Sequence, residues 1–451
     1  MASTMLQRTQ SGTETDSKKA TISVWVKLGG SHVGNFNAGI FGTHVSGNYG
    51  ADGNTQIGFY NGGLYAWFKD GGGTYYKQES TRRFRDHNAW YHLVYRFDMT
   101  ESTASNRIRV YVNGEEITSW SSTNNPSSTQ NIQMNNGGRI VRVGTYNFTG
   151  GTNNDFDGCM SHFHFCDGYS YAPTEFGETD STTGEWKINT SPSVSYGNNG
   201  FFILKDGNSV TDQSGNSNNF TVAGGTLTKT EDCPSNVFCT MNSLDNYYSG
   251  FSFANGNTTV NLDNISERYV MGNLGVSSGK WYWEGKLVSS SGFTYSKIGI
   301  EGSEMKNTTN GYQADSYGYR GENGGKKVNN GTFTNWGNSY TNGDIIGVAV
   351  DLDNNYIYFS KNGTWQESGD PTSGSSGTGA AFSLTTPSTG FYYPAIGKED
   401  ADTCTWSFNF GNGYFGTTAV ASAGTNASGN GIFEYDVPTG YTALSTKGLN
   451  E

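Results

Sequence analysis

A predicted β-hairpin between Gly343 and Gly363 constrains the fold more than any other stretch of the sequence. Two alternating apolar runs in GDIIGVAVDLDNNYIYFSKNG flank a tight Asp-Asn-Asn turn, and an Asn-Gly turn closes the second run. The apolar residues Ile345, Ala349 and Leu352 fall on changing faces of the first run. Because a strand that is apolar on both faces is typical of a sandwich centre, we predict a β-sandwich here.

A second predicted strand lies sixty residues upstream. The run SSGKWYWEGKL, from Ser277 to Leu287, places Trp281 and Trp283 on one face of a strand. This GKWYWE strand, the IGVAVDLD...YFSKNG hairpin and the NFG at Asn409 to Gly411 together resemble the SPRY domain. The resemblance implies a β-sandwich that serves in binding.

The N-terminal half carries a different set of alternating segments. In chain order they are TISVWVK, WYHLVYRFD, IRVYVNGEEI and FDGCMSHFHFCD, which occupy residues 21–27, 90–98, 108–117 and 156–167. In the first of them Ile22, Val24 and Val26 share one face and Trp25 stands on the other. This order resembles the laminin-G-like or concanavalin-A-like jelly roll, and the resemblance covers about residues 1 to 228.

We therefore expect an all-β protein with two β-sandwich domains, a concanavalin-A-like jelly roll followed by a SPRY-like domain. A length of 451 residues suits two such domains. The expected boundaries are a polar docking segment at 1–19, a jelly roll at 20–228, a connector at 229–250 and a SPRY-like sandwich at 251–451. Residues 169–197 of the jelly roll are expected to form an ordered arm, because Phe176 and Trp186 would otherwise be exposed.

Composition narrows the class of protein further. Sixty-four glycines, eight prolines and 14% aromatic residues favour short strands joined by tight turns over helices. A net charge of -12 argues against a nucleic-acid partner, and no apolar run approaches the roughly 20 residues of a membrane span. The N-terminus has no apolar core of a secretory signal. Five cysteines, an odd number, indicate reduced folding in a cytoplasm rather than a disulfide framework.

The order of the motifs along the whole chain is informative as well. An opening MLQRT, an FGETD...GEW arm, a DQSGNSNNFTV segment, a DCPSNVF...NSLDN connector and a SPRY-like domain resemble virion and tail-associated proteins of tailed bacteriophages, especially marine ones. The resemblance implies a virion location after assembly in the host cytoplasm, with capsid or tail proteins as partners. A homotrimer is implied only by analogy with phage fibres.

The sequence lacks the patterns expected of a catalytic site. Two carboxylate pairs, Glu178 with Asp180 and Glu434 with Asp436, lack the third carboxylate of the E-x-D-x-x-E arrangement of glycoside hydrolases. No G-x-S-x-G elbow occurs, and no cysteine stands in a setting that would activate its thiol. We therefore expect no enzyme.

Two groups of residues have the chemistry of metal ligands. His162, His164 and Cys166 share one face of a predicted strand, with Cys159 three residues before the first of them, and in principle such a set can hold zinc. Packing beneath the arm is the alternative explanation of this cluster.

A rim loop offers the second group. It contains Asn153, Asn154, Asp155 and Asp157, whose oxygens suit calcium, and laminin-G-like jelly rolls often carry calcium at a rim. The same residue types also form ordinary turns. The candidate calcium ligands are Asp155 and Asp157; the sequence requires no cofactor, and calcium is the one that its residues could hold.

Sugar binding needs an exposed aromatic platform with hydrogen-bonding groups around it. The candidate platform consists of Tyr312, Tyr317, Tyr319 and Trp336, where SPRY-like domains place their binding loops. The first domain offers a second group, Tyr60, Tyr65, Trp67, Tyr75 and Tyr76, around glycine turns. The alternative is that most of these aromatic rings belong to the cores.

These observations predict a non-enzymatic virion surface or tail protein that contributes to host attachment through glycan or protein binding. Repetition on the particle would strengthen weak individual sites. One alternative is a structural decoration or connector protein of the capsid or tail. Another is a polysaccharide depolymerase.

Overall fold

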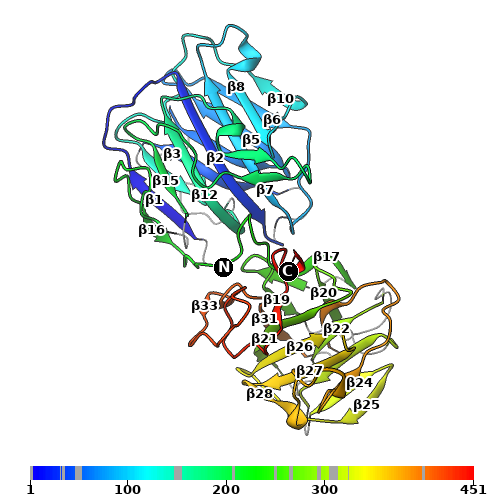
Figure 1. Cartoon of the computed structure of the whole chain (residues 1–451). Coiled ribbons are helices and arrows are strands. Elements are labelled where there is room, and N and C mark those ends of the chain that lie inside the picture. The colour runs from blue at the N-terminus through cyan, green and yellow to red at the C-terminus, as the bar shows by residue number, and fades with distance from the viewer. Residues whose placement is uncertain are drawn as a thin grey trace. The chain divides into compact units, whose positions relative to one another are not determined.

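The computed structural model shows an all-β chain, which confirms the predicted fold class (Figure 1). The structure describes residues 4–30, 32, 36–45, 53–146, 155–205, 209–247, 251–263, 268–291, 296–303, 313–322, 325–398 and 402–450. The chain divides into two compact units, Met1–Lys229 and Thr230–Glu451. No helix among these described residues is long and apolar enough to cross a membrane.

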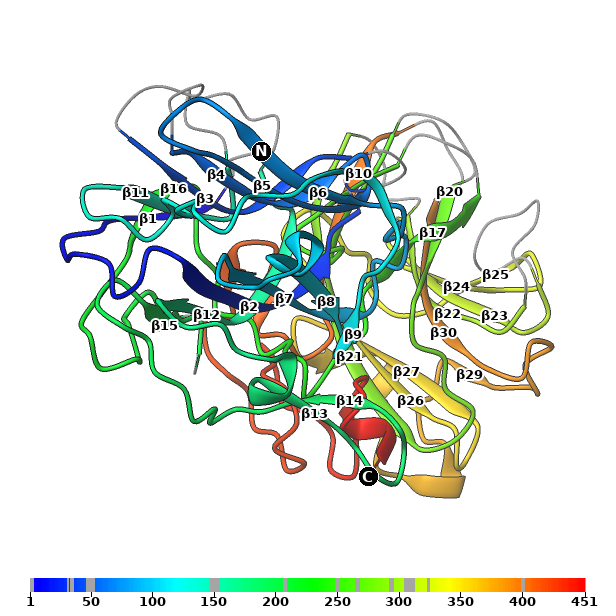
Figure 2. The same ribbon diagram turned by 90° about the horizontal axis from the view of Figure 1, so that it is seen from above.

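Two sheets face each other in the first unit (Figure 2). The eight-stranded sheet has the order β10 (Trp120–Asn124), β6 (Tyr75–Ser80), β5 (Gly63–Lys69), β4 (Thr55–Tyr60), β3 (Ala38–His44), β11 (Ile140–Val143), β1 (Met5–Thr9) and β16 (Thr221–Gly224). The six-stranded sheet has the order β15 (Phe201–Ile203), β12 (Gly158–Asp167), β2 (Lys19–Leu28), β7 (Trp90–Asp98), β8 (Ile108–Val112) and β9 (Glu115–Glu116). Short 3-10 turns follow at η1 (Ala104–Asn106) and η2 (Pro173–Glu175).

The core of the first unit lies between these sheets. Ile22, Val24 and Val26 of β2 are completely buried in it, as the alternation predicts. Trp25 lies on the opposite face of the same strand, where its ring stacks on His92 of β7 at 4.9 Å between centroids. The predicted assignment of β2 side chains to two faces is therefore confirmed.

The segment at residues 169–197 lies on the outer face of the six-stranded sheet. It contains a two-stranded sheet formed by β13 (Gly177–Thr179) and β14 (Trp186–Ile188), seen beneath the six-stranded sheet in Figure 2. Trp186 Nε1 donates a hydrogen bond to His92 Nδ1 at 2.9 Å, and the Phe176 ring lies 5.1 Å from that of His164. These contacts hold the arm against the sheet.

The start of the chain differs from its expected role as a separate docking segment. Strand β1 lies between β11 and β16 and pairs with both, and Leu6 within it is buried in the core. The sequence MLQRT contains two apolar and two strongly polar residues, so its alternation is too short to be recognised. Backbone hydrogen bonding to two neighbours makes this segment an internal strand of the sheet.

The second unit contains two larger sheets and a small one of two strands. The seven-stranded sheet has the order β17 (Met241–Tyr247), β20 (Arg268–Gly272), β30 (Tyr393–Lys398), β22 (Lys297–Glu301), β23 (Ser316–Arg320), β24 (Lys326–Asn329) and β25 (Thr332–Asn335). The nine-stranded sheet has the order β18 (Phe251–Ala254), β19 (Thr259–Leu262), β31 (Cys404–Asn409), β21 (Lys280–Ser290), β26 (Ile345–Asp351), β27 (Tyr356–Lys361) and β28 (Thr364–Trp365), with β29 (Phe382–Ser383) on β27 and β34 (Thr442–Ala443) on β21. The small sheet pairs β32 (Tyr414–Phe415) with β33 (Thr418–Ala419), and 3-10 turns occur at η3 (Gln366–Ser368), η4 (Gly374–Ser376) and η5 (Gly448–Asn450).

The predicted hairpin is present as β26 and β27. Strand β26 lies between β21 and β27, and all of its residues are buried, as expected of a central strand. Asn355 and Asn362 have φ angles of 62° and 47° in the two turns, a region that asparagine tolerates better than most residues. The turn residues and the apolar pattern therefore both predicted this hairpin correctly.

The expected connector belongs to the second unit. Strand β17 pairs with β20, and Phe238, Cys239 and Met241 are buried in the core of this unit. The composition changes near residue 224, as the sequence indicated, but the second sandwich begins at Thr230. In β17 Met241 is buried while Leu244 is 53% exposed, so the strand has no apolar alternation that the sequence could show.

Candidate functional site

Four aromatic side chains form a strip on the outer face of the eight-stranded sheet in the first unit. We call Tyr60, Tyr65, Trp67 and Tyr75, from β4, β5 and β6, the aromatic strip. Strand β5 alternates strictly, since Leu64, Ala66 and Phe68 are buried in the core while Tyr65 and Trp67 are only partly buried. The period of two therefore presents the aromatic side chains outward from a regular strand.

The members of the strip contact one another in pairs. The Tyr60 and Tyr65 ring centroids are 5.5 Å apart, and those of Trp67 and Tyr75 are 5.1 Å apart. Tyr60 is 42% exposed and Tyr75 is 45% exposed. Tyr76, the neighbour of Tyr75, faces the core, where its ring lies 5.2 Å from that of Phe68. Two of the four rings are thus exposed and two are half-buried, and stacking on a ligand requires such accessible aromatic surface.

Charged groups border the strip on β5 and β6. Lys77 and Glu79 form an ion pair at 2.9 Å, and the Lys69 ammonium lies 5.1 Å from the centre of the Tyr75 ring. Gly58 of β4 stands opposite Tyr65 in the register and has no side chain to cover it. A ring surface with donors and acceptors beside it suits a hydroxyl-rich, partly apolar ligand such as a pyranose.

The aromatic residues predicted for sugar binding in the second unit lie elsewhere. Tyr317 is 2% exposed, Tyr319 is 0% exposed and Trp336 is 9% exposed, and all three belong to the core cluster. Tyr319 lies 5.3 Å from Trp336 in an edge-on arrangement. Their rings fill the space between the sheets, so these three do not form the exposed platform that the sequence suggested. Tyr312 lies outside the described residues.

The predicted zinc cluster is enclosed by aromatic rings. A β-bulge between Ser161 and His164 interrupts the alternation of β12, and His162 there has a φ of 49°. His164 is stacked on Phe202 at 3.9 Å, and its Nδ1 lies 2.9 Å from the Tyr196 hydroxyl. The structure thus shows the packing beneath the arm that was the alternative explanation.

Burial also acts on the thiol of this cluster. Cys166 is completely buried, and burial raises its pKa well above the usual range, which disfavours the thiolate that binds zinc. Within the described part of the chain, no group of three or more His, Cys, Asp and Glu side chains is placed to hold a metal ion.

Half of the candidate calcium loop lies within the described residues. Asp155 forms a bridge with Thr145, and the Asp157 backbone N–H donates to His32 Nε2 at 2.9 Å. Asn153 and Asn154 lie outside the described residues. Calcium binding at Asp155 and Asp157 therefore stays a prediction.

The two carboxylate pairs considered for catalysis make structural contacts. Asp180 forms an ion pair with Lys187 at 2.5 Å across the β13–β14 hairpin. Glu434 Oε2 accepts a hydrogen bond from the Ala421 backbone, and Asp436 Oδ1 accepts one from the Thr425 backbone. Three of these carboxylates thus stabilise turns and loops.

A buried carboxylate that the sequence did not single out lies in the GKWYWE strand. Glu284 is completely buried and accepts hydrogen bonds from the Glu434 and Tyr435 backbone N–H groups, both at 2.9 Å. The Tyr282 hydroxyl and the Asn409 amide donate to it at 3.1 and 3.2 Å. Burial raises its pKa to about 7. The glutamate that directly follows three aromatic residues, in the run WYWE, was the sequence signal for this clamp on the C-terminal segment.

Two family matches agree with the two units. Residues 6–172 match the concanavalin A-like lectin/glucanases superfamily (Laminin_G_3), and residues 280–413 match the SPRY domain. The chain therefore carries a concanavalin-A-like domain followed by a SPRY domain.

Individual relatives cover only parts of the chain. Ran-binding protein 9 of Danio rerio is 36% identical over 86 residues, which are 19% of this chain and 14% of that protein. A probable ATP-dependent RNA helicase ddx1 of Dictyostelium discoideum is 31% identical over 138 residues, 31% of this chain and 15% of that protein. Because the chain spans so little of these eukaryotic proteins, the expected virion origin stays a prediction.

Solved structures show weak similarity to single units. The SPRY domain of human HERC1 is 18% identical with a TM-score of 0.29, covering 37% of this chain and 96% of that one. A heptameric SAP-like pentraxin from Limulus polyphemus is 14% identical with a TM-score of 0.27, covering 38% and 72%.

Proposed function

We propose that this protein is a non-enzymatic binding protein of a bacteriophage virion, which contributes to host attachment by binding surface glycans through its first unit. The observation that carries the proposal is the aromatic strip, whose exposed and half-buried rings lie on regular strands and are bordered by charged side chains. The virion location rests on the order of motifs along the chain. Both matched domain types commonly serve in binding.

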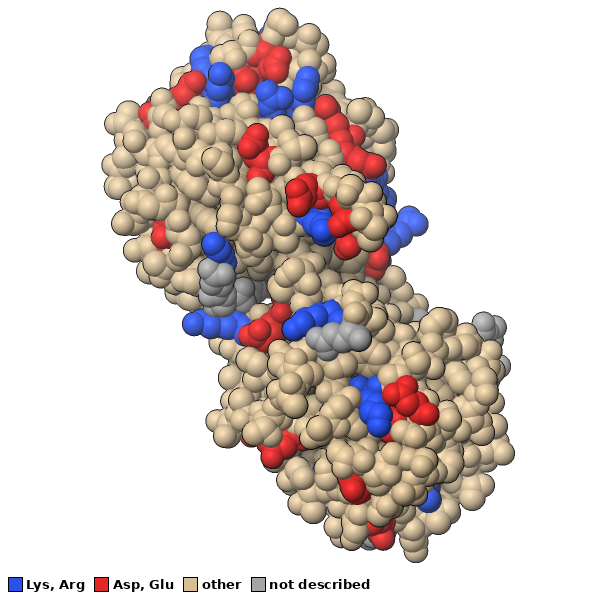
Figure 3. Space-filling model, in the orientation of Figure 1, with Lys and Arg blue, Asp and Glu red and all other residues tan. Residues whose placement is uncertain are grey.

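The geometry of the strip suits weak, repeated binding. Ring stacking on one sugar contributes about 0.5–1.5 kcal/mol beyond the area that it buries, so a single strip binds weakly. Many copies on one particle would convert weak contacts into firm attachment. Figure 3 shows that Lys, Arg, Asp and Glu cover only a small part of the face that it draws. Charged residues make up 15% of the chain, so neutral polar groups and rings would provide most of the contacts to a glycan.

The test is binding of the purified full chain to host cells and to their extracted surface polysaccharide. We expect saturable binding that free polysaccharide competes away, and a loss of about tenfold or more in Trp67→Ala. Phe391→Ala is the matched control, because Phe391 is an exposed aromatic residue, 45% accessible, in the other unit. Full binding by a folded Trp67→Ala protein would refute the role of the strip.

The same experiment separates the other functions. A structural decoration or connector protein would bind neither cells nor polysaccharide while remaining folded. A polysaccharide depolymerase would release reducing ends during the incubation. Either result would refute host attachment as proposed and would support the corresponding alternative function.

A further inference from the structure

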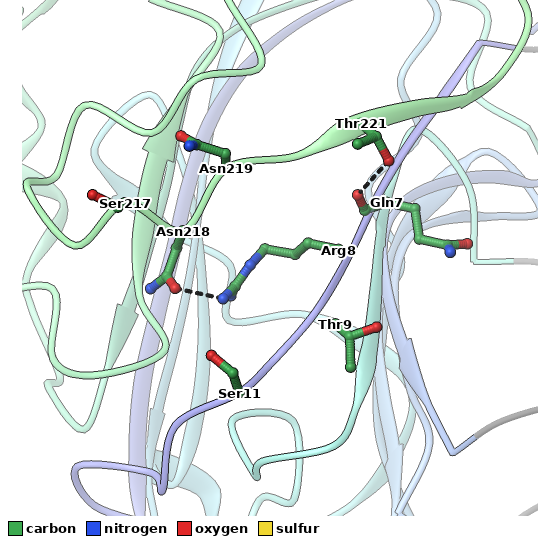
Figure 4. A pocket seen from close by; sticks show the side chains of 8 residues that line it. All are labelled: Gln7, Arg8, Thr9, Ser11, Ser217, Asn218, Asn219 and Thr221. Atoms are coloured by element: carbon green, nitrogen blue, oxygen red, sulfur yellow. Dashed lines mark hydrogen bonds between the residues drawn. The ribbon is translucent and has the colours of Figure 1, made fainter.

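A polar pocket opens in the first unit where β1 meets the segment that leads into β16 (Figure 4). The pocket is open to solvent and has a volume of about 400 Å³. Its lining is entirely polar and combines hydroxyl, amide and guanidinium groups, including those of Gln7, Arg8, Thr9, Ser11 and Asn218. This volume is in the range of pockets that hold small ligands.

The guanidinium of Arg8 is the only charged group in this lining. Arg8 is 8% exposed, and it donates from Nη1 to the Asn199 carbonyl at 3.1 Å and from Nη2 to Asn218 Oδ1 at 2.5 Å. Figure 4 shows the side chain directed toward Asn218 along one wall. Two of its five N–H donors are used, and no carboxylate among the described residues forms an ion pair with it.

The acidic side chain whose charge acts on Arg8 is engaged in other hydrogen bonds. Burial lowers the pKa of Arg8, and the charge of Asp212 partly offsets this effect. The Asp212 carboxylate accepts hydrogen bonds from the backbone N–H groups of Phe202, Ser214 and Asn218, at 2.8, 2.9 and 2.8 Å. Buried cations in proteins are usually paired, so the uncommitted donors of Arg8 favour an added anion.

We propose that this pocket binds the carboxylate of an acidic sugar, with the Arg8 guanidinium as its partner. A planar fork of N–H donors matches a carboxylate in geometry and charge. The surrounding hydroxyl and amide groups provide both donors and acceptors for sugar hydroxyls. The pocket and the aromatic strip lie on different strands of the same sheet, so this inference stands without the proposed function.

The test compares three small probes by ligand-observed saturation-transfer NMR on the full chain. Glucuronate and glucose differ only in the carboxylate at one carbon, and acetate supplies the carboxylate without the sugar. We expect glucuronate to bind at least tenfold more tightly than either glucose or acetate, because a charge-assisted pair and the hydroxyl contacts both contribute. Equal affinity for glucuronate and glucose, equal affinity for glucuronate and acetate, or no binding of glucuronate would each overturn the proposal.

A substitution in the pocket wall locates the binding. Ser11→Asp would place a carboxylate beside the guanidinium, and Ser11 is exposed, so the fold should tolerate the change. We expect it to weaken glucuronate binding at least tenfold. Thr103→Asp adds the same charge at an exposed position of the same unit outside the pocket and should leave the binding unchanged. Equal effects of the two substitutions in folded proteins would refute the assignment to this pocket.

Discussion

Lowering the pH from 7 to 5 should destabilise the first unit and stabilise the second. All six histidines of the chain lie in the first unit, and burial lowers the pKa of five of them: His32, His44, His87, His92 and His164. In the second unit, burial raises the pKa of Glu284 and of Glu301, each to about 7. The two units therefore respond to protons with opposite sign.

The magnitude follows from linkage between protonation and folding. The pKa of His92 is about 3 in the folded chain, against an ordinary value of about 6.5 in the unfolded chain. The unfolded state thus gains protons as the pH falls below 6.5 while the folded state does not, so stability decreases. Between pH 7 and pH 5 this histidine costs about 2 kcal/mol of unfolding free energy.

The buried glutamates act in the opposite direction. Their folded pKa of about 7 lies above the ordinary value of about 4.3, so the folded state takes up protons first as the pH falls. Each contributes about 2 kcal/mol of added stability to the second unit between pH 7 and pH 5. Burial also raises the pKa of Asp167, which opposes the histidines in the first unit.

Buried thiols report on each unit separately within the intact chain. Cys166 of the first unit is 0% exposed and Cys404 of the second is 3% exposed, so each is protected until its unit unfolds. Urea titrations with a brief pulse of a methanethiosulfonate reagent, read by peptide mass spectrometry, give a midpoint for each thiol. On acidification the Cys166 midpoint should fall and the Cys404 midpoint should rise, by about 1 M for each 2 kcal/mol.

A matched variant tests the assignment to the glutamates. Glu301→Gln removes one titrating group, so it should remove roughly half of the rise in the Cys404 midpoint and leave Cys166 unchanged. Midpoints that move in the same direction in the two units would refute the reasoning.

Three further predictions concern segments held by specific contacts. Trp186→Ala removes the hydrogen bond and ring contact to His92 and should destabilise the arm by about 2 kcal/mol, seen as faster proteolysis within residues 169–197 while the Cys166 midpoint changes little. Deletion of residues 1–9 removes β1, which leaves β16 without its partner strand and β11 paired with β3 alone, so Cys166 should be labelled without urea. Continued protection of Cys166 would show that β1 is dispensable. Glu284→Ala leaves two backbone N–H groups and an amide without an acceptor, so it should lower the unfolding free energy of the second unit by about 3 kcal/mol. The Cys404 midpoint should fall accordingly, by about 1.5 M urea, whereas an unchanged midpoint would contradict the clamp.

The sequence predicted strands correctly where the alternating run was long and the turn residues were distinctive. The β26–β27 hairpin has both, as does β2, whose alternation assigned Trp25 to the outer face correctly. Strand β1 was missed because five residues carry too little periodicity, although two neighbours hold it in the sheet. Local sequence does not reveal pairing partners that are distant in the chain.

The sequence predicted the exposure of the candidate binding residues less well than it predicted the strands. Alternation distinguishes two faces of a strand but does not say which face another sheet covers. Tyr317 and Tyr319 therefore have the same appearance in the sequence as Tyr65 and Trp67, yet the first pair is buried and the second lines the outer face. The Arg8 pocket depends on residues about 200 positions apart, which only the folded chain brings together.

The aromatic strip and the Arg8 pocket together make a prediction about polymer length. In the eight-stranded sheet, β5 and β1 are separated by β4, β3 and β11, so four interstrand steps, about 19 Å, separate the two strands across the sheet. Arg8 lies on the same side of β1 as the buried Leu6, whereas the strip lies on the outer face, so a chain that joins the two sites must be longer than this and must pass round the edge of the sheet. One long acidic polysaccharide chain could occupy both sites in this way, and the second contact would then be intramolecular. Trp67→Ala and Ser11→Asp should therefore show coupled losses for an acidic polysaccharide in a double-mutant cycle, but independent effects on glucuronate. Additive losses for the polymer would show that the two sites bind separate chains.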